Sequence, residues 1–326
     1  MPPEHLFDSI ETEQTLFREG MQLAQQQELN WIEFHEKFST EEACRDYLYR
    51  MRWPNGFNCP ACGYNRAYKI AKRHLYECTE CGYQASVTAG TIMHKTRTSL
   101  KIWFWIIYLM ANDKRGTSAT QLSQQFGISY PTAWMMMHKI RKAMGNRDSQ
   151  YTLAGLVEMD DTLIGAPTEG GKRGRGTEKT KVVASLSLTN SGNPVYLKMN
   201  VVDDLKSTTI VEVANKTITT GAKVSTDLYR SYNQLSREGY THSPKEFNYE
   251  NNPDHLKWLH TIISNAKAFI AGTYHGLEPK HLQAYLDEYC YRFNRRMFKG
   301  QSFNRLLNAC VSTNSVTFDD IVGMAA

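Results

Sequence analysis

The segment Leu156-Val157-Glu158-Met159-Asp160-Asp161-Thr162 decides the fold of this chain. Its length and its apolar residues predict a strand, yet it carries three acidic side chains, and burying an unpaired carboxylate in a sheet is costly. We therefore expect the acids either to hold a metal ion or to lie at an exposed edge. Because side chains alternate along a strand, Asp160 and Asp161 should face opposite sides.

The residues that follow this segment predict the rest of a sheet. Further strands are predicted over 181–188, 194–202 and 222–226, with a turn at 190–193 and a helix over 207–217. The last strand ends at a second acid, Asp227. Three strands, a helix and a further strand, with acids on the first and fourth strands, indicate an RNase H-like α/β domain with a mixed sheet, in which the two carboxylates meet at the sheet centre.

Upstream, two cysteine pairs predict a metal site. They are Cys59-Pro-Ala-Cys62-Gly and Cys78-Thr-Glu-Cys81-Gly, with fifteen residues between the pairs. Each pair can place two thiolates on one side of a tight turn, and four sulfurs close a tetrahedral zinc site, so a structural zinc ribbon is expected. The segment between the pairs is rich in β-forming and basic residues. Its candidate nucleic-acid contacts are Lys69, Lys72 and Arg73.

The stretch 116–144 predicts a helix-turn-helix. A short helix would end at Gly127, which permits the turn, and Ser129 would cap a second helix with Pro131 in its first turn. Trp134, Met137 and Ile140 would face inward. The side chains expected to face DNA are Tyr130, Thr132, His138, Lys139, Arg141 and Lys142. The alternative is a helix pair with a purely structural role.

The charge distribution favours a nucleic-acid partner. The 326 residues have a net charge of +5, but residues 44–147 hold sixteen Lys or Arg against four acids, whereas residues 1–43 hold two against ten. Such a basic segment is typical of proteins that displace counterions from phosphates, although a solvated basic face is the alternative.

Two further basic segments are candidates for contact with DNA. The glycine-rich loop 165–176 contains Lys172, Arg173 and Arg175 and lacks the Lys-Ser/Thr ending of a P-loop. A helix over 279–298 ends near Arg295 and Arg296, which would contact DNA or would only complement the helix dipole.

No membrane partner is expected. The longest apolar run, residues 102–111, is about half the length that a bilayer-spanning helix requires. The N-terminal residues lack the pattern of a secretory signal, so we expect a reducing cytoplasm and free cysteines.

Several short motifs, in this order, resemble those of insertion-sequence transposases of the DDE class, in the group with an N-terminal zinc ribbon. The motifs are Trp53-Pro-x-Gly-x-x-Cys59-Pro-x-Cys62, Thr88-Ala-Gly-Thr91, Val157-Glu-x-Asp160, Ser225-Thr-Asp227, Ile263-Ser-Asn265-Ala-Lys267, Gly272-Thr-Tyr-His275, and Tyr285-Leu-Asp-Glu288 with Arg292-Phe-Asn-Arg-Arg296. Together they span nearly the whole chain.

The resemblance implies a bacterial DNA transposase that binds the terminal inverted repeats of its element, then cuts and rejoins DNA. Asp160 and Asp227 would hold magnesium or manganese ions in a two-metal mechanism. The enzyme would act as a homodimer or larger assembly on the nucleoid of a prokaryotic cytoplasm. The alternatives are a DNA-binding regulator and a domesticated, inactive transposase.

The third catalytic position departs from the DDE pattern, because no glutamate occurs between Glu250 and Glu278. A subgroup of relatives uses Asn there, and Asn265 matches its motif. His260 is the rival, and the two lie about 140° apart on an ideal helix, so both should not reach one ion. Asp254 is a more distant candidate, while Glu158 and Asp161 compete with Asp160 for the first position. Lys267 is expected to contact a DNA phosphate.

The predicted architecture is multidomain α+β. Its parts are an acidic helical segment over 1–52, the zinc ribbon over 53–92, a helical and helix-turn-helix region over 93–147, the RNase H-like domain over 148–300 and a C-terminal tail over 301–326.

Overall fold

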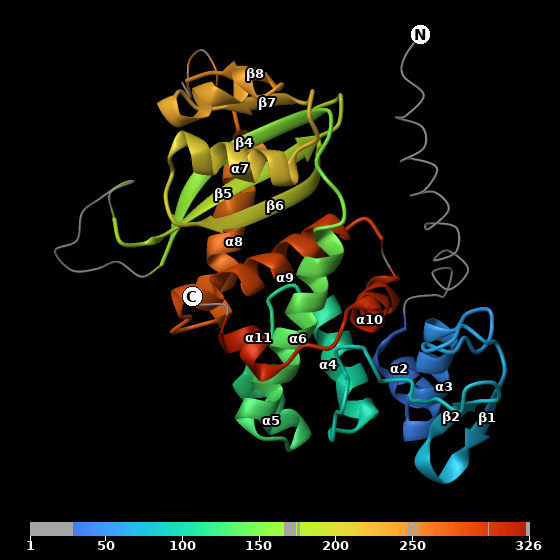
Figure 1. Cartoon of the computed structure of the whole chain (residues 1–326). Coiled ribbons are helices and arrows are strands. Elements are labelled where there is room, and N and C mark those ends of the chain that lie inside the picture. Colours follow the sequence, from blue (N-terminus) through green and yellow to red (C-terminus); the bar gives the residue numbers. More distant parts are fainter. Residues whose placement is uncertain are drawn as a thin grey trace. The chain divides into compact units, whose positions relative to one another are not determined.

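The computed structural model describes residues 29–165, 174, 177–246, 250, 252, 254–298 and 300–323. The chain divides into two compact units (Figure 1). The ribbon unit comprises Met1–Asn112 and Met297–Val316, and the sheet unit comprises Asp113–Arg296 and Thr317–Ala326. The predicted helical region over 93–147 is thus shared between the units, because its two halves pack against different partners.

In its described residues, the ribbon unit combines a small antiparallel sheet with four helices. Its elements are α2 (Trp31–Lys37), α3 (Glu41–Arg52), β1 (Ala67–Ile70), the 3₁₀ turn η1 (Ala71–Arg73), β2 (Leu75–Cys78), β3 (Gln84–Ala85), α4 (Leu100–Asn112) and α10 (Ser302–Ser312), with strand order β1-β2-β3. Helix α4 is apolar on nearly every side, and α3 and α10 cover it. Aromatic rings form the core, with Phe303 of α10 packed edge-on against Phe34 of α2 at 5.0 Å.

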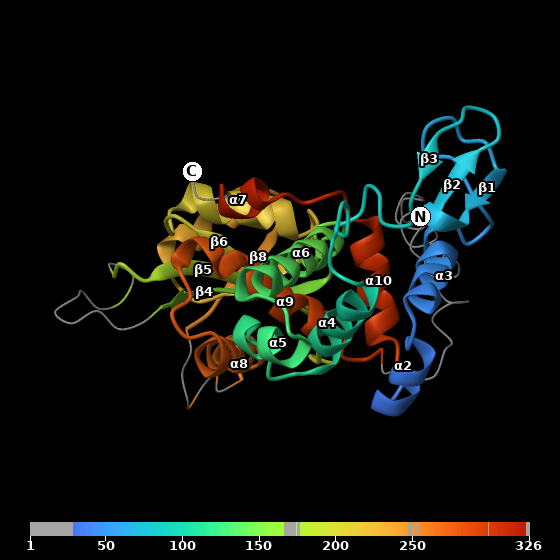
Figure 2. The same ribbon diagram turned by 90° about the horizontal axis from the view of Figure 1, so that it is seen from below.

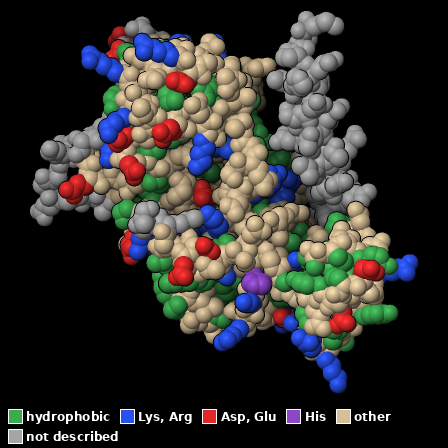
Figure 3. Space-filling view, viewed as in Figure 1, with side chains coloured by type: hydrophobic (Ala, Val, Ile, Leu, Met, Phe, Trp, Pro, Cys, Tyr) green, Lys and Arg blue, Asp and Glu red, His purple; other side chains and the backbone are tan. Residues whose placement is uncertain are grey.

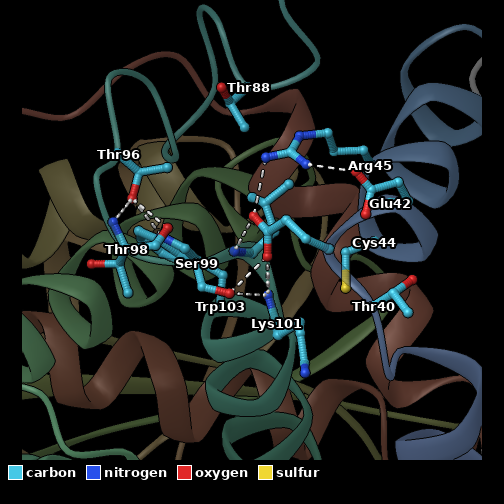
Figure 4. Close-up of polar contacts among 12 residues, drawn as sticks. Thr40, Glu42, Cys44, Arg45, Thr88, Thr96, Thr98, Ser99, Lys101 and Trp103 are labelled. Atoms are coloured by element: carbon cyan, nitrogen blue, oxygen red, sulfur yellow. Dashed lines mark hydrogen bonds and ion pairs between the residues drawn. The ribbon is translucent and has the colours of Figure 1, made fainter. Parts of the chain in front are cut away.

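Glu41 joins α3 to the start of α4. Its carboxylate accepts hydrogen bonds from the Ser99 hydroxyl at 2.7 Å and from the backbone N–H groups of Leu100 at 3.0 Å and Lys101 at 3.4 Å. Arg45 also pairs with Glu41, at 3.4 Å, and Figure 4 labels Arg45, Ser99 and Lys101, three of the residues that contact this carboxylate. Burial pushes the pKa of Glu41 up, but the hydrogen bonds outweigh burial and hold the pKa below its usual value. A carboxylate thus satisfies N–H groups that the helix cannot satisfy internally.

The sheet unit contains a five-stranded mixed sheet. Its elements are α5 (Ala119–Phe126), α6 (Tyr130–Asp148), β4 (Leu156–Ile164), β5 (Thr180–Leu188), β6 (Pro194–Val202), α7 (Ser207–Thr217), β7 (Lys223–Thr226), the 3₁₀ helix η3 (Arg230–Arg237), β8 (Thr241–Pro244), α8 (Lys257–Thr273), the 3₁₀ turn η4 (Pro279–His281), α9 (Leu282–Asn294) and α11 (Phe318–Val322). The strand order is β6-β5-β4-β7-β8. Strand β4 runs antiparallel to β5 and parallel to β7. This order confirms the RNase H-like fold.

Each face of the sheet is covered by its own helices. One apolar core joins Val157 and Met159 of β4 to α7 and η3. The other joins Ile164 and the alternate residues of β5 to α8 and α9. Figure 2 shows α7 and the α8–α9 pair on opposite sides of the strands. The alternation along β4 therefore separates Met159 and Asp161 from Glu158 and Asp160.

The helix-turn-helix is confirmed as a local structure. Helix α5 ends at Gly127, whose φ is +62°, and Ser129 caps α6 by accepting a hydrogen bond from the Thr132 N–H at 3.3 Å. Helix α6 continues four residues beyond the predicted end, to Asp148, and packs against α9.

The segment 301–326, predicted as a tail, instead contains α10 and α11. Phe303, Leu306, Leu307 and Cys310 recur at helical spacing in α10 and are buried. In the described residues, no helix is long and apolar enough to cross a bilayer.

Candidate metal centres and nucleic-acid interface

The register between β4 and β7 brings the two predicted acids together. In this parallel pair Glu158 lies opposite Ser225. Asp160 lies two residues beyond Glu158 on β4, and Asp227 lies two residues beyond Ser225, directly after β7, so the parallel register carries both acids toward the same end of the strand pair. Residues 67 positions apart in the sequence thereby reach the same end of the sheet centre.

Asp160 has a histidine partner on α8. Its Oδ2 atom lies 3.0 Å from Nε2 of His260, and its side chain is only 13% exposed. The hydrogen bond to Asp160 raises the pKa of His260, and the charges of Glu158 and Asp227 act in the same direction. Asp227 therefore lies within electrostatic range of the same imidazole. The Oδ1 atom of Asp227 accepts a hydrogen bond from the Tyr229 N–H at 2.9 Å, which orients the carboxylate.

The other two acids of β4 have different surroundings. Glu158 is buried and accepts a hydrogen bond from the Leu259 N–H at 3.2 Å, and burial raises the pKa of its carboxyl group. Asp161 points to the opposite face, where the Tyr232 hydroxyl donates to it at 3.4 Å. Glu158 thus fixes the start of α8, and Asp160 is the acid placed beside His260.

Helix α8 presents His260 and Asn265 on different flanks. The buried stripe of the helix is formed by Leu259, Ile262, Ile263, Ala266, Phe269 and Ile270. His260 and Lys267, seven residues apart, lie within about 20° of each other on one flank, while Asn265 lies about 140° from His260 on the other. Partial burial and the charge of Lys179 lower the pKa of Lys267, and the charge of Asp160 opposes this change. Lys267 is therefore within electrostatic range of Asp160. The structure thus pairs His260 with Asp160, places Asp227 and Lys267 within electrostatic range of that pair, and leaves Asn265, which is exposed, on the far flank.

Two histidines that sequence reasoning missed brace the end of β7. The Thr226 hydroxyl lies 2.8 Å from Nε2 of His242, and the Thr226 carbonyl lies 3.0 Å from Nε2 of His255. Thr226 is fully buried and directly precedes Asp227. Because His242 and His255 come from separate segments, no local pattern could have identified this brace.

The four cysteines form the second centre. Sγ of Cys59 lies 3.6 Å from that of Cys81, and Sγ of Cys62 lies 3.6 Å from that of Cys78. All four lie within 4.8 Å of one another, and in the described part of the chain they are the only group of three or more metal-donor side chains this close. Sulfurs at the corners of a tetrahedral zinc site are about 3.8 Å apart, given a Zn–S distance of about 2.3 Å. The residues therefore fit a structural zinc ion.

Both cysteine pairs form the same backbone knuckle. The N–H of Gly63 donates to the Cys59 carbonyl at 2.9 Å, and the N–H of Gly82 donates to the Cys78 carbonyl at 3.0 Å. The φ angles of the two glycines are +77° and +69°. Glycine adopts such positive angles at little cost, which explains why a glycine follows each cysteine pair.

The predicted DNA contacts of the ribbon are accessible. Lys69, Lys72 and Arg73 are exposed along β1 and at the turn between β1 and β2. Figure 3 shows blue side chains projecting from the end of the ribbon. Tyr68, 71% exposed, lies beside them, so this hairpin offers both charge and an aromatic surface.

The predicted DNA-facing set of α6 requires a correction. Tyr130 is 51% exposed, and Thr132, Lys139 and Lys142 are partly exposed. The interpretation of His138 and Arg141 as DNA contacts is wrong, because they are 3% and 1% exposed. Their turns of α6 pack against α9, where Arg141 forms an ion pair of 2.8 Å with the buried Glu288. The predicted inward residues Met137 and Ile140 are buried, as expected.

Arg295 and Arg296 are also structural. Arg295 pairs with Asp148 at 2.7 Å, and Arg296 donates to the backbone carbonyls of Pro194 and Val195 at the start of β6. Both guanidinium groups therefore join α9 to its neighbours, while their contact with DNA stays a prediction. Lys172, Arg173 and Arg175 lie outside the described residues.

Two family models match the chain. Residues 152–294 match the ISXO2-like transposase domain, and residues 39–84 match the transposase zinc-ribbon domain. Together the two matches cover more than half of the chain. No curated protein matches it.

Solved structures resemble the chain only distantly. The crystal structure of a pre-cleavage Mos1 transpososome is 11% identical, with a TM-score of 0.27, over 65% of this chain and 78% of that one. The mariner Mos1 paired end complex with Mg is 9% identical, with a TM-score of 0.21, over 60% and 77%. These scores are too low to support an argument from either structure.

The catalytic-domain match spans the acid-bearing sheet, and the zinc-ribbon match includes the four clustered cysteines. The chain therefore belongs to the insertion-sequence transposases that join a zinc ribbon to an ISXO2-like DDE transposase domain.

Proposed function

We propose that this transposase binds the terminal inverted repeats of its element and catalyses metal-dependent strand cleavage and strand transfer, with Asp160, Asp227 and His260 as the metal-binding set. The observation that supports this set is the 3.0 Å contact between His260 and Asp160, at the end of the strand pair toward which the parallel register also carries Asp227. Two element ends must be joined in one complex, so the active form is a dimer or larger, acting on nucleoid DNA.

The donor set suits a divalent ion. Two carboxylates are ligands for Mg²⁺ or Mn²⁺, and a neutral imidazole adds a nitrogen that Mn²⁺ accepts more readily than Mg²⁺. A bound pair of ions would lower the pKa of the attacking water or 3′-hydroxyl and stabilise the leaving oxygen. The three side chains are not close enough together to hold one ion as they stand. Metal binding would therefore require them to rotate and would break the direct hydrogen bond between His260 and Asp160. We expect Mn²⁺ to support higher activity than Mg²⁺.

The remaining residues have positioning roles in this proposal. Glu158 anchors the start of α8 through the Leu259 N–H, which places His260 beside Asp160. Lys267, on the His260 flank, is available to neutralise a DNA phosphate near the acids. Asn265 lies on the other flank and is not part of the set. No covalent protein intermediate is needed for this chemistry.

The test is cleavage and joining of a labelled duplex that carries the inverted repeats flanking this chain's own reading frame. Wild type should cut with Mn²⁺ or Mg²⁺, while Asp160→Ala, Asp227→Ala and His260→Ala should bind the duplex without cutting it. Asp161→Asn is the matched control, because Asp161 adjoins Asp160 but points to the opposite face. Binding without metal-dependent cutting by wild type would instead identify a DNA-binding regulator or an inactive transposase.

A further inference from the structure

The sheet unit contains a pocket that the proposed chemistry does not use. It has a volume of about 470 Å³ and lies between the start of α5, one stripe of α6, the loop after α8 and the start of α9. The stripe of α6 consists of Tyr130, Trp134, Met137 and Arg141, spaced so that all four share one side of the helix. This volume falls in the range of pockets that hold small organic molecules.

A buried guanidinium group forms part of the pocket lining. Arg141 is 1% exposed, and its Nε donates to Glu288 at 2.8 Å. Its guanidinium carbon lies 3.8 Å from the ring centre of Tyr285, which also lines the pocket. The guanidinium also lies 5.2 Å from the ring centre of Tyr274, so Arg141 fixes two of the aromatic rings that line the pocket.

The charge around Arg141 argues against a phosphate ligand. Glu288 is fully buried and already neutralises the guanidinium. Glu278, which also lines the pocket, pairs with Lys280 at 2.9 Å, and Glu288 also pairs with Arg292 at 3.5 Å. The charges around the pocket are thus engaged in ion pairs, which favours a neutral planar group over a phosphate.

The walls consist largely of aromatic rings. Trp134 lies 5.4 Å from His281 and 4.0 Å from the buried His138, and Tyr274 lies 4.6 Å from Tyr285. Tyr130, half exposed, lies at the first residue of α6. Such rings bind a planar heteroaromatic group by stacking, and stacking tolerates any base.

The pocket lies where a helix-turn-helix approaches DNA. Tyr130 begins α6, and Ser118, Ala119 and Thr120 begin α5. The first residues of the second helix are those that contact base edges in this motif. A nucleotide displaced from a bound duplex would therefore be close to the opening.

We propose that this pocket receives one nucleobase turned out of the DNA duplex that the helix-turn-helix binds, stacked on Trp134 and Tyr130. The proposal rests on the DNA binding proposed above. Its ligand is a base of any of the four kinds, because stacking on aromatic rings tolerates every base. Unpairing and unstacking the base is unfavourable, and stacking on the two rings offsets that cost.

The experiment measures binding of the full, zinc-loaded chain, without added magnesium or manganese, to terminal-repeat duplexes that each lack the base opposite one chosen position. Where a base turns out, loss of its partner removes the unpairing cost, so affinity should rise on the order of 10-fold at one position. 2-Aminopurine placed at that position should change its fluorescence on binding. Trp134→Ala and Tyr130→Ala should weaken binding of the intact duplex by about 5- to 150-fold and abolish the position-specific gain.

Tyr196→Ala, a partly exposed tyrosine of β6 outside the pocket, is the matched control and should leave both readouts unchanged. If Trp134→Ala fails to fold, the more exposed Tyr130→Ala and the wild-type fluorescence decide the question. The pocket proposal would be overturned if wild type bound tightly but no missing base raised its affinity, or if the same rise in affinity occurred in both variants. Either result would leave the proposed function intact. Failure of wild type to bind any terminal-repeat duplex would overturn both.

Discussion

The cysteine centre and the acid centre are assembled in different ways. The four cysteines lie within a segment of 23 residues, 59–81, and two similar knuckles hold their sulfurs within 4.8 Å of one another. Asp160, Asp227 and His260 come from the middle of one strand, the end of another and a helix, and they do not form so compact a group. A closed four-ligand site suits a structural ion, whereas an open set leaves room for substrate oxygens. The comparison indicates that the ribbon depends on its metal for folding, while the sheet unit depends on its own core.

Removal of zinc should produce the largest effect. Structural zinc sites contribute roughly 10–16 kcal/mol of apparent binding free energy, so chelation or Cys59→Ser should unfold the ribbon. The sheet unit, with an apolar core on each face, should keep its cooperative unfolding transition. Calorimetry of the full chain with and without chelator checks this. A single transition that disappears entirely on chelation would contradict the difference between the two centres.

The packing of α6 against α9 should be sensitive to loss of Glu288. Glu288→Ala leaves Arg141 buried without its partner, and breaking such a pair costs about 3–5 kcal/mol. Arg292 also pairs with Glu288, at 3.5 Å, so two guanidinium groups lose their counter-charge. Urea unfolding of the sheet unit should shift accordingly, while zinc content stays at the wild-type level. An unchanged unfolding midpoint would show that the Arg141–Glu288 pair is not essential to the packing of α6 against α9.

Substitutions on the two flanks of α8 should separate His260 from Asn265. His260→Ala should lower the cleavage rate by about 100-fold or more, as expected when a positioned group acting on the reaction is removed. Asn265→Ala should change the rate less than about threefold, because its side chain is on the other flank. Single-turnover cleavage with saturating Mn²⁺ measures both. The reverse ranking would restore the prediction that Asn265 fills the third position.

A smaller effect is expected from Asp287 on α9. Burial raises the pKa of this carboxyl group to about 6, although Gln283 donates a hydrogen bond to it at 2.8 Å. The folded state therefore binds the proton more tightly than the unfolded state, and stability should fall as pH rises from about 4 to about 6. Asp287→Asn should stabilise the protein by roughly 1–2 kcal/mol at pH 7 and lose this advantage below about pH 4. Denaturant unfolding at both pH values tests the sign, and equal gains would contradict it.

Much of the fold could be predicted from local patterns. The alternating strands of β4, β5 and β6, the cap at Ser129 and the turn at Gly127 each follow from a few adjacent residues, and the structure confirms them. The orientation of α6 could not be predicted in this way. Basic and aromatic residues at helical spacing fit a DNA-reading face and a core face equally well, and only the packing of α9 shows that His138 and Arg141 belong to the core.

By itself, the sequence determined the zinc ribbon, the strand that carries Asp160 and the order of elements around it, because these depend on short-range spacing. Tertiary structure decided which side chains share a site. The parallel register of β4 and β7 carries Asp160 and Asp227 toward the same end of the strand pair, and the docking of α8 through Glu158 turns His260, not Asn265, toward Asp160. Spacing along one helix fixes the angle between two side chains, but the face that the helix buries determines which of them meets the acids.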